Sequence, residues 1–395
     1  MASSLILLTI VLAVLAVILR QDFVLTLCYL LLGAFIIGRG WTRRALNAVA
    51  FTRTLSSRHV FVGEKVQVRL DVVNREWLPV IWLQLHDTLP VSMATPPFFT
   101  RVVSLGPRGR VGFEYALQSY KRGYYRIGPL TLYSGDVLGL GEEAVRVTAP
   151  DSLIVYPKVV PLTWVPLPSQ SPMGNLRHTQ PIFEDPSRVI GKRDYVAGDS
   201  LQRVDWKATA VVGRLQVKQY QPSIALETLI VLNLTPSDYN LRTRSDDSEL
   251  AIVVAASLAN WVTGRKQAVG LITTGKDPLA AGGRSPMLPS RKGRAHLARI
   301  LEMLARIELA ESGPLVDALR RESVRLSWGT TLIVITPQAD ELLFDGLLQA
   351  RRAGLNVMLI VCGFGVVSEA RRKAQQLGIP VHSITRERDL DMWRR

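Results

Sequence analysis

Cysteine and histidine are both scarce in this chain of 395 residues, which contains two cysteines and five histidines. Cys28 and Cys362 lie far apart, so they offer neither a disulfide framework nor the paired spacing of a zinc site. The sequence has no H-E-x-x-H pair, no phosphate-binding G-x-x-x-x-G-K-[ST] loop and no nucleophile elbow G-x-S-x-G. Common hydrolase motifs are therefore missing, and we expect a protein that is not an enzyme.

Acidic residues are also few, since 33 aspartates and glutamates stand against 48 lysines and arginines, for a formal net charge of +15. Much of this charge is typical of solvated helix faces. The basic residues Arg291, Lys292 and Arg294 lack interleaved aromatic side chains, so we expect no nucleic-acid partner. Binding to anionic lipid or nucleic acid stays open as a weaker alternative, which a steep salt dependence would reveal.

Two apolar runs without internal charge, residues 5–19 and 23–37, stand near the N-terminus. With their flanks they approach the ~20 residues of a membrane-spanning helix, so we expect a transmembrane helical hairpin over residues 1–40. A signal peptide is disfavoured, because no basic residue precedes the first run and a second run follows at once. A hairpin buried in a soluble core is the other alternative.

The charges around the two runs predict the topology. Arg39, Arg43, Arg44 and Arg53 follow the second run, whereas the connection between the runs carries only Arg20 and Asp22. The positive-inside rule then predicts a two-pass protein of the inner (plasma) membrane, with its soluble domains facing the cytoplasm.

Residues 54–150 have the pattern of short strands separated by turns. Apolar and polar residues alternate over 66–72 and 111–117, and Gly106-Pro107-Arg108-Gly109 has the composition of a turn. Several short strands at this spacing predict an antiparallel β-sandwich. Such a module commonly serves as a spacer or a binding platform.

Residues 151–225 combine a Pro-rich connection with a charged segment, and residues 226–395 alternate apolar strands with amphipathic helices. Strands are expected near 229–234, 268–272, 332–335, 357–361 and 381–384. This order predicts a doubly wound, Rossmann-like α/β domain, whose ligands would bind at the carboxyl ends of the strands. The loop 275–293, rich in Gly, Pro and basic residues, is expected to be disordered.

The most specific stretch of the chain is residues 192–220. Gly198 suits a positive φ angle, and Asp199 or Ser200 can cap a helix that begins at Leu201. In such a helix Asp199 and Arg203 form an i,i+4 pair. Alternation from Leu215 onward predicts a strand.

Three runs in this stretch, R-x-Y-x-x-G-D, R-x-D-W-K-x-T-A and L-x-V-K-x-Y, resemble the signature of the bacterial domain of unknown function 58 family. The N-terminal hairpin, the run KRGYYRIGPLTLYSGDVLGL at 121–140 and a C-terminal region similar to a von Willebrand factor A domain extend this resemblance over nearly the whole chain. The resemblance implies a membrane-anchored companion of a MoxR-type AAA+ ATPase. Its signature residues here are Arg193, Tyr195, Gly198, Asp199, Arg203, Asp205, Trp206 and Lys207.

These signature residues allow two interpretations. In the first, their ion pairs join the segment to the α/β sheet, and Trp206 packs in the seam. In the second, they form a docking surface for the partner ATPase, with Trp206 and Arg203 as anchors.

The similarity to von Willebrand A domains also implies a place for a metal ion. Those domains hold a divalent cation with an Asp-x-Ser-x-Ser loop and with Thr and Asp from later loops. Here Asn233, Thr235 and Ser237 form the first loop, and Thr336-Pro337-Gln338 stands where Thr-Asp-Gly is usual. Because Mg²⁺ is normally held through one or two carboxylates, we expect a degenerate site without a cofactor. Four nearby acids could restore it: Asp238, Asp246, Asp247 and Glu249.

Together these features predict a non-catalytic membrane scaffold or adaptor, whose partners are the lipid bilayer, a MoxR-type ATPase and, as a further option, envelope proteins. The alternative is a metal-dependent hydrolase or a ligand-binding protein that uses the crevice at the strand ends. The neutral residues Asn233 and Gln338 argue against that alternative.

Overall fold

The computed structural model describes residues 2–135, 144–168, 184–222, 227–280, 286–311, 313–363 and 367–394. The chain divides into two compact units, Met1–Lys158 with Leu301–Arg306, and Val159–Ile300 with Ile307–Arg395. We refer to the sheet-forming part of the first as the β unit and of the second as the α/β unit.

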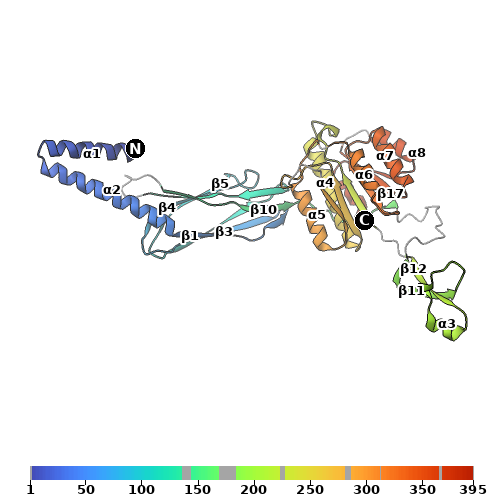
Figure 1. Cartoon of the computed structure of the whole chain (residues 1–395). Helices are drawn as coiled ribbons and strands as arrows, with labels where there is room; N and C mark the ends of the chain where they lie inside the picture. The colour runs from blue at the N-terminus through green and yellow to red at the C-terminus, as the bar shows by residue number, and fades with distance from the viewer. Residues whose placement is uncertain are drawn as a thin grey trace. The chain divides into compact units, whose positions relative to one another are not determined.

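Two helices open the chain, α1 (Ala2–Ile18) and α2 (Asp22–Ala48), and they lie side by side (Figure 1). The expected interruption is present at residues 19–21, where Arg20 has a φ of 52°. By length and composition α2 could cross a membrane, and the shorter apolar helix covers Leu7–Ile18. The second helix runs eleven residues beyond the apolar run that ends at Ile37, because Ala45 and Leu46 are buried in the core of the β unit.

Three sheets form the β unit, in the strand orders β1-β3-β6, β5-β4-β8-β9 and β2-β10-β7. Apolar residues of the first two sheets, such as Leu70 on β3 and Leu85 on β4, share one core cluster with the end of α2. A purely antiparallel arrangement was expected, but the pair β10–β2 is parallel. The strands are β1 (Val49–Leu55), β2 (His59–Phe61), β3 (Lys65–Asn74), β4 (Val80–Thr88), β5 (Phe98–Leu105), β6 (Arg110–Gln118), β7 (Gly123–Ile127), β8 (Leu130–Ser134), β9 (Ala144–Val147) and β10 (Asp151–Tyr156).

A charged network crosses the interior of the β unit. The Arg53 guanidinium donates to Asp87 at 2.5 Å and to Asp151 at 2.8 Å, and the Tyr115 hydroxyl donates to Asp87 at 2.7 Å. The side chains of Arg53 and Asp87 are 2% and 0% exposed. Burial raises the pKa of Asp87, although Tyr115 and Arg53 act to lower it. The cost of desolvation therefore outweighs the attraction at this carboxylate.

One six-stranded sheet forms the centre of the α/β unit, in the order β15-β14-β13-β16-β17-β18. All neighbours are parallel except β14 and β15. Helices cover both faces of this sheet (Figure 1). On one face, α6, α7 and α8 share a core with alternate strand residues such as Leu229. The residues between them, such as Ile230, are also buried, and α4 contacts the same strands. The elements are β13 (Glu227–Leu232), α4 (Arg244–Gly264), β14 (Ala268–Thr273), β15 (Met287–Arg291), α5 (Arg294–Arg306), α6 (Leu315–Ser323), β16 (Thr331–Thr336), α7 (Glu341–Arg352), β17 (Asn356–Cys362), α8 (Val367–Gln376) and β18 (Val381–Ile384).

The edge strand β15 contradicts the prediction that the whole loop 275–293 is disordered; of that loop, residues 281–285 lie outside the described residues. Pro289 argues against a strand in the sequence, but an edge strand tolerates proline because one side of it needs no partner. Gly270 on β14 permits the pairing, since a Cβ there would lie 2.9 Å from the Ser290 backbone nitrogen. Helix α6 was also not predicted.

Residues 159–167, part of the Pro-rich connection, form neither helix nor strand and pack on α4. Val160 N–H donates to Ser257 Oγ at 2.9 Å, and Trp261 Nε1 donates to Thr163 O at 3.3 Å. The following part of the connection, residues 169–183, lies outside the described residues.

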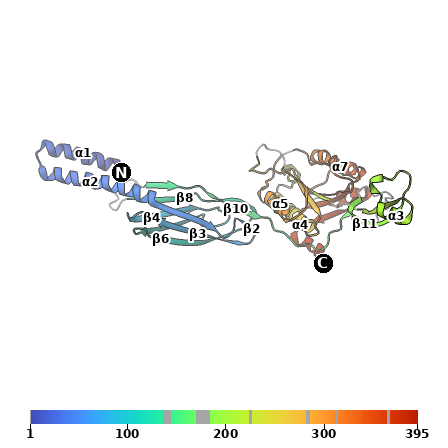
Figure 2. The ribbon, with the colours of Figure 1, turned by 60° about the horizontal axis from the view of Figure 1, so that its bottom comes forward.

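Residues 184–222 contain the eight signature residues, and we call them the signature segment. They form a strand pair with two short helical pieces between the strands (Figure 2). Strands β11 (Glu184–Asp194) and β12 (Gln216–Pro222) pair in antiparallel fashion, and between them lie the single turn η2 (Leu201–Arg203) and helix α3 (Trp206–Val212). The strand predicted from Leu215 is thus present one residue later.

Candidate functional site

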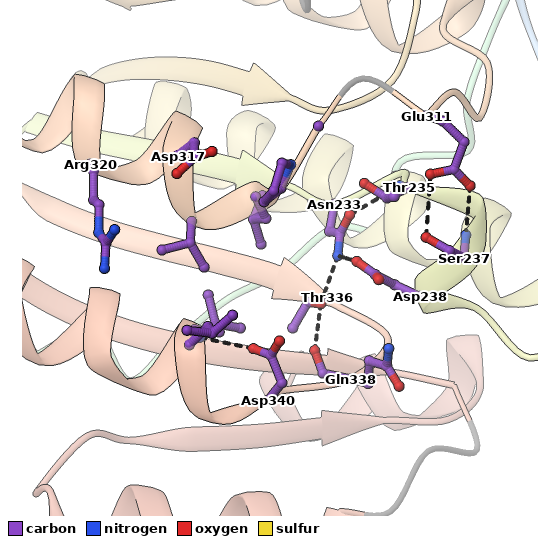
Figure 3. A pocket seen from close by; sticks show the side chains of 16 residues that line it. Asn233, Thr235, Ser237, Asp238, Glu311, Asp317, Arg320, Thr336, Gln338 and Asp340 are labelled. Atoms are coloured by element: carbon purple, nitrogen blue, oxygen red, sulfur yellow. Dashed lines mark hydrogen bonds between the residues drawn. The ribbon is translucent and has the colours of Figure 1, made fainter.

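A cavity of about 470 Å³ opens at the carboxyl ends of β13 and β16, where the strand order changes direction. One wall comes from the loops after these two strands and is polar. The other comes from the starts of α6 and α7 and combines apolar side chains with the charged Asp317, Arg320 and Asp340 (Figure 3). The structure brings together here the four residues of the expected degenerate site, Asn233, Thr235, Ser237 and Thr336. Doubly wound sheets bind ligands at this position.

Asn233 lies at the centre of the polar wall, and both the nitrogen and the oxygen of its side-chain amide form hydrogen bonds. Nδ2 donates to Asp238 Oδ2 at 2.7 Å and to Thr336 Oγ1 at 3.1 Å. Oδ1 accepts from Thr235 N–H at 3.0 Å and from Thr274 Oγ1 at 3.2 Å. A flipped amide would set its oxygen against the Asp238 carboxylate, so the hydrogen bonds fix the orientation.

Glu311 is the residue of this site that the sequence did not suggest. Its carboxylate accepts from Ser237 N–H at 3.1 Å and from Ser237 Oγ at 3.3 Å (Figure 3). It follows α5, 74 positions after Ser237, and no motif marks it. Ser237 and Glu311 are the nearest approach to a nucleophile and base here, but the described lining includes no histidine or cysteine.

Of the four acids that could restore a metal site, Asp238, Asp246, Asp247 and Glu249, one lines the cavity. Asp238 lies in the cavity wall, held by Asn233. Asp247 is buried in the first turn of α4, where it accepts from the Thr243 hydroxyl at 2.6 Å. Asp247, Asp246 and Glu249 are not among the residues that line the cavity. In the described part of the chain, no group of three or more His, Cys, Asp or Glu side chains could hold a metal ion.

The ion pairs described for the signature segment, Lys192–Asp205, Arg193–Asp199 and Arg214–Asp194, join residues of the segment itself. Arg193 binds Asp199 through two hydrogen bonds of 2.7 Å, and Val196 N–H donates to the same carboxylate. Asp199 thus bridges β11 and the turn at Gly198, whose φ is +110°. The Arg193 guanidinium binds both carboxylate oxygens of Asp199. Arg203, the expected i,i+4 partner, adds its charge, since it also lowers the pKa of Asp199.

The 3-10 turn η2 begins at Leu201 as expected, although the Ser200 side chain forms no cap hydrogen bond, and the α-helix begins only at Trp206. Asp205 caps it by accepting from Ala208 N–H at 3.1 Å, pairs with Lys192 at 3.0 Å, and its own N–H donates to Gln216 O at 2.8 Å. These contacts anchor Asp205 to both strands, so it is a better helix start than Asp199 or Ser200. Gly213, at φ +72°, ends the helix.

Apolar side chains of the segment are mostly exposed. Trp206 is 67% exposed, and its packing in a seam against the α/β sheet stays a prediction. Val204 and Val217 are buried, at 6% and 2%. We call the five most exposed large apolar side chains, each at 55% or more, the Trp206 surface: Val196, Leu201, Trp206, Val211 and Val212. Arg203 and Lys207 are exposed beside it, and Tyr195 N–H is tied to Leu215 O.

Acid is expected to loosen this segment. The pKa of Asp199 lies below its ordinary 3.8, chiefly through the Arg193 hydrogen bond, and that of Asp205 lies below 3.8, chiefly through the Lys192 hydrogen bond. Because the folded segment binds these protons less tightly than the unfolded chain, the stability they contribute is present above pH 3.8 and is lost as pH falls below it. Amide shifts of Val196 and Ala208, followed by NMR, should titrate in this range, and Asp205→Asn should abolish the Ala208 titration alone. Shifts that stay constant to pH 2 would contradict this.

In a comparison with known proteins, residues 191–358 match the family model described as "Protein of unknown function DUF58". The chain is 23% identical over 333 residues to the uncharacterised protein YeaD of Bacillus subtilis, a match that covers 80% of this chain and 76% of that protein. It is 29% identical over 140 residues to the uncharacterised protein Rv1480 of Mycobacterium tuberculosis, covering 34% of this chain and 42% of that protein.

Among solved structures, the chain is similar to an aerotolerance-related membrane protein from Bacteroides fragilis, with 13% identity, a TM-score of 0.32, and coverage of 42% of this chain and 94% of that one. The resemblance read from the signature residues thus agrees with the family match, which includes all eight of them and the cavity wall from Asn233 to Gln338.

Proposed function

We propose that this chain is a non-catalytic, membrane-anchored adaptor whose α/β unit, with the signature segment, binds a partner protein. The observation that carries the proposal is the Trp206 surface, a set of five exposed apolar side chains on a segment whose described ion pairs join its own residues. Large exposed apolar side chains in one small segment favour a protein interface, and tryptophan and arginine are frequent anchors there.

The partner class follows from the resemblance. The family resemblance implies a MoxR-type AAA+ ATPase, and we propose that the Trp206 surface, with Arg203 and Lys207 beside it, is the face it binds. The strand order β15-β14-β13-β16-β17-β18 supports a von Willebrand A-like fold for the α/β unit, as that resemblance also implies.

The N-terminal helices supply the anchor. We propose that α1 and α2 cross the inner (plasma) membrane as a hairpin, with the β and α/β units in the cytoplasm. The apolar composition of both helices and the arginines after Ile37 support this topology.

Affinity capture from native membranes tests the adaptor function. The full-length protein is crosslinked with and without ATP, and the captured proteins are identified by mass spectrometry. Recovery of an AAA+ ATPase in an ATP-dependent manner is the expected result. Capture of cell-wall or polysaccharide proteins without any ATPase would contradict it and make the β unit the binding module.

The cavity at the strand ends supports a second candidate, a ligand-binding or hydrolytic site, but its chemistry argues against a divalent cation. The Asn233 amide already donates to Asp238 and Thr336, the groups that would otherwise offer oxygen ligands. We propose that this amide replaces the cation and holds the two loops together.

Calorimetric titration with Mg²⁺ and Mn²⁺ checks this proposal. The wild-type chain should give no micromolar binding, because no lone pair of Asn233 points at a common centre with Asp238. Asn233→Asp provides the comparison, since it adds a carboxylate beside Asp238 and Thr336. Micromolar binding to the wild type would overturn the metal-free interpretation and favour the hydrolase.

A further inference from the structure

The end of the β unit where α2 enters carries exposed basic and aromatic groups that the adaptor function does not use. We call it the α2 end, and it consists of the last turns of α2 (residues 39–48), the β3–β4 connection (75–79) and the β5–β6 turn (106–109). Figures 1 and 2 both show α2 entering the unit at one end of its strands.

Hydrogen bonds hold the three pieces of the α2 end together. Arg75 N–H donates to Ala48 O, and Arg108 N–H donates to Glu76 O, both at 3.0 Å. The buried Asn74 side chain donates to Leu78 O at 2.7 Å and to Gly106 O at 3.1 Å. The loops are therefore fixed to the helix, and β1 begins directly where α2 ends, without a flexible linker.

A contact of Trp41 gives the depth of the α2 end. Trp41 Nε1 donates to Pro79 O at 3.1 Å. Trp41 follows the last apolar residue of the run, Ile37, by four positions, or about 6 Å along the helix axis. The headgroup layer on each side of the hydrocarbon core is about 5–8 Å thick. A bilayer spanned by α2 would thus bring the 75–79 connection to the depth of the headgroups.

The chemistry of the α2 end fits that depth. Trp77, at the middle of the connection, is 65% exposed, and tryptophan is enriched at membrane interfaces. Arg43, Arg44, Arg75 and Arg108 are exposed as well. Within the three pieces the carboxylate is Glu76; the β8–β9 connection, with Asp136, Glu142 and Glu143, lies outside the described residues.

Arg108 adds an independent observation. It stands at the tip of the β5–β6 turn with a φ of 52°, a left-handed conformation that favours glycine. This conformation costs free energy for a residue other than glycine, and it sets an arginine at the exposed tip of the turn.

We propose that the α2 end rests on the membrane surface, with Trp77 in the interface and Arg43, Arg44, Arg75 and Arg108 bound to anionic lipid headgroups. This inference rests on the anchoring by α2 that is part of the proposed function. Arginine matches the phosphate of a headgroup through paired N–H donors. The β unit is then a base seated on the bilayer and not a module tethered above it.

Labelling of the full chain in vesicles tests this. Cys28 and Cys362 are replaced by alanine, and Trp77→Cys or Val102→Cys carries a fluorophore; Val102 is a matched apolar control, 61% exposed on β5. In vesicles containing phosphatidylglycerol, iodide should quench the label at 77 about threefold less than the label at 102. The combined variant R43Q/R44Q/R75Q/R108Q, or neutral vesicles, should remove that protection and leave residue 102 unchanged.

The outcomes separate the inference from the anchoring. Equal quenching at 77 and 102 in anionic vesicles, for a chain that floats with them, overturns the inference alone. Protection at 77 that survives in neutral vesicles and in the arginine variant overturns the headgroup contacts. A chain that does not float with any vesicle overturns the anchoring and the inference together.

Discussion

Replacing Asp87 with alanine is expected to destabilise the β unit by about 3–5 kcal/mol, the usual cost of removing one partner from a buried ion pair. The loss comes from Arg53, whose side chain is 2% exposed. Among the described residues it would keep the partly exposed Asp151 and the Ile127 carbonyl as partners. The Tyr115 hydroxyl would lose its acceptor as well. Urea unfolding of the full-length protein in detergent, followed by circular dichroism, measures the change.

The matched control for this prediction is Asp71→Ala in the same unit. Asp71 pairs with Arg69 and Arg110 at 3.2 Å, but these arginine side chains are 55% and 65% exposed. Exposed pairs contribute about 0–1 kcal/mol. Equal losses of unfolding free energy in Asp87→Ala and Asp71→Ala would contradict the prediction. They would mean that Arg53 becomes hydrated when Asp87 is removed, so that no charge stays buried without a partner.

The expected loss does not mean that the pair is a source of net stability, because desolvation offsets the attraction within a buried pair. The two partners differ: burial raises the pKa of Asp87 and so opposes its charge, whereas the pKa of Arg53, which burial lowers, is raised overall by Asp87 and Asp151. The loss of stability in Asp87→Ala arises because the Arg53 charge stays buried without its main partner. Tyr115→Phe, which leaves both charges in place and removes one hydrogen bond to the carboxylate, should accordingly cost less, about 1–2 kcal/mol.

The central parallel strands of the α/β unit could be predicted from the sequence because each is a short, mostly apolar run that is buried on both faces. Thr331–Thr336 and Asn356–Cys362 are such runs, and the expected positions lie inside them. Edge strand β15 could not be predicted in the same way, since its side chains are alternately exposed and half-buried and Pro289 interrupts the pattern.

The long range of the contacts explains the other differences. Asn233 and Thr336 could be assigned to one site because both follow strands, and parallel strands end at a common edge. Glu311 reaches that site from an irregular stretch, which carries no periodic signal. Likewise, the start of α3 depends on Asp205 bonding to Lys192 and Gln216, so a local capping rule chose the nearer Asp199 and Ser200.

Replacing Trp206 with alanine is expected to lower ATP-dependent capture of the partner ATPase about 30-fold, the size of an interface hot spot of about 2 kcal/mol. Because Trp206 is 67% exposed, the melting of the protein itself should shift little. Capture yield and thermal melts are measured on the same preparations.

Trp164→Ala is the matched control, since Trp164 is a second exposed tryptophan, at 51%, that lies outside the signature segment. Both variants lose a large exposed ring, so a general effect of apolar surface on crosslinking would lower capture for both. Loss confined to Trp206→Ala assigns the effect to the Trp206 surface. A lowered melting temperature with unchanged capture would instead support the architectural interpretation, in which Trp206 stabilises the fold; the ATPase would then bind elsewhere.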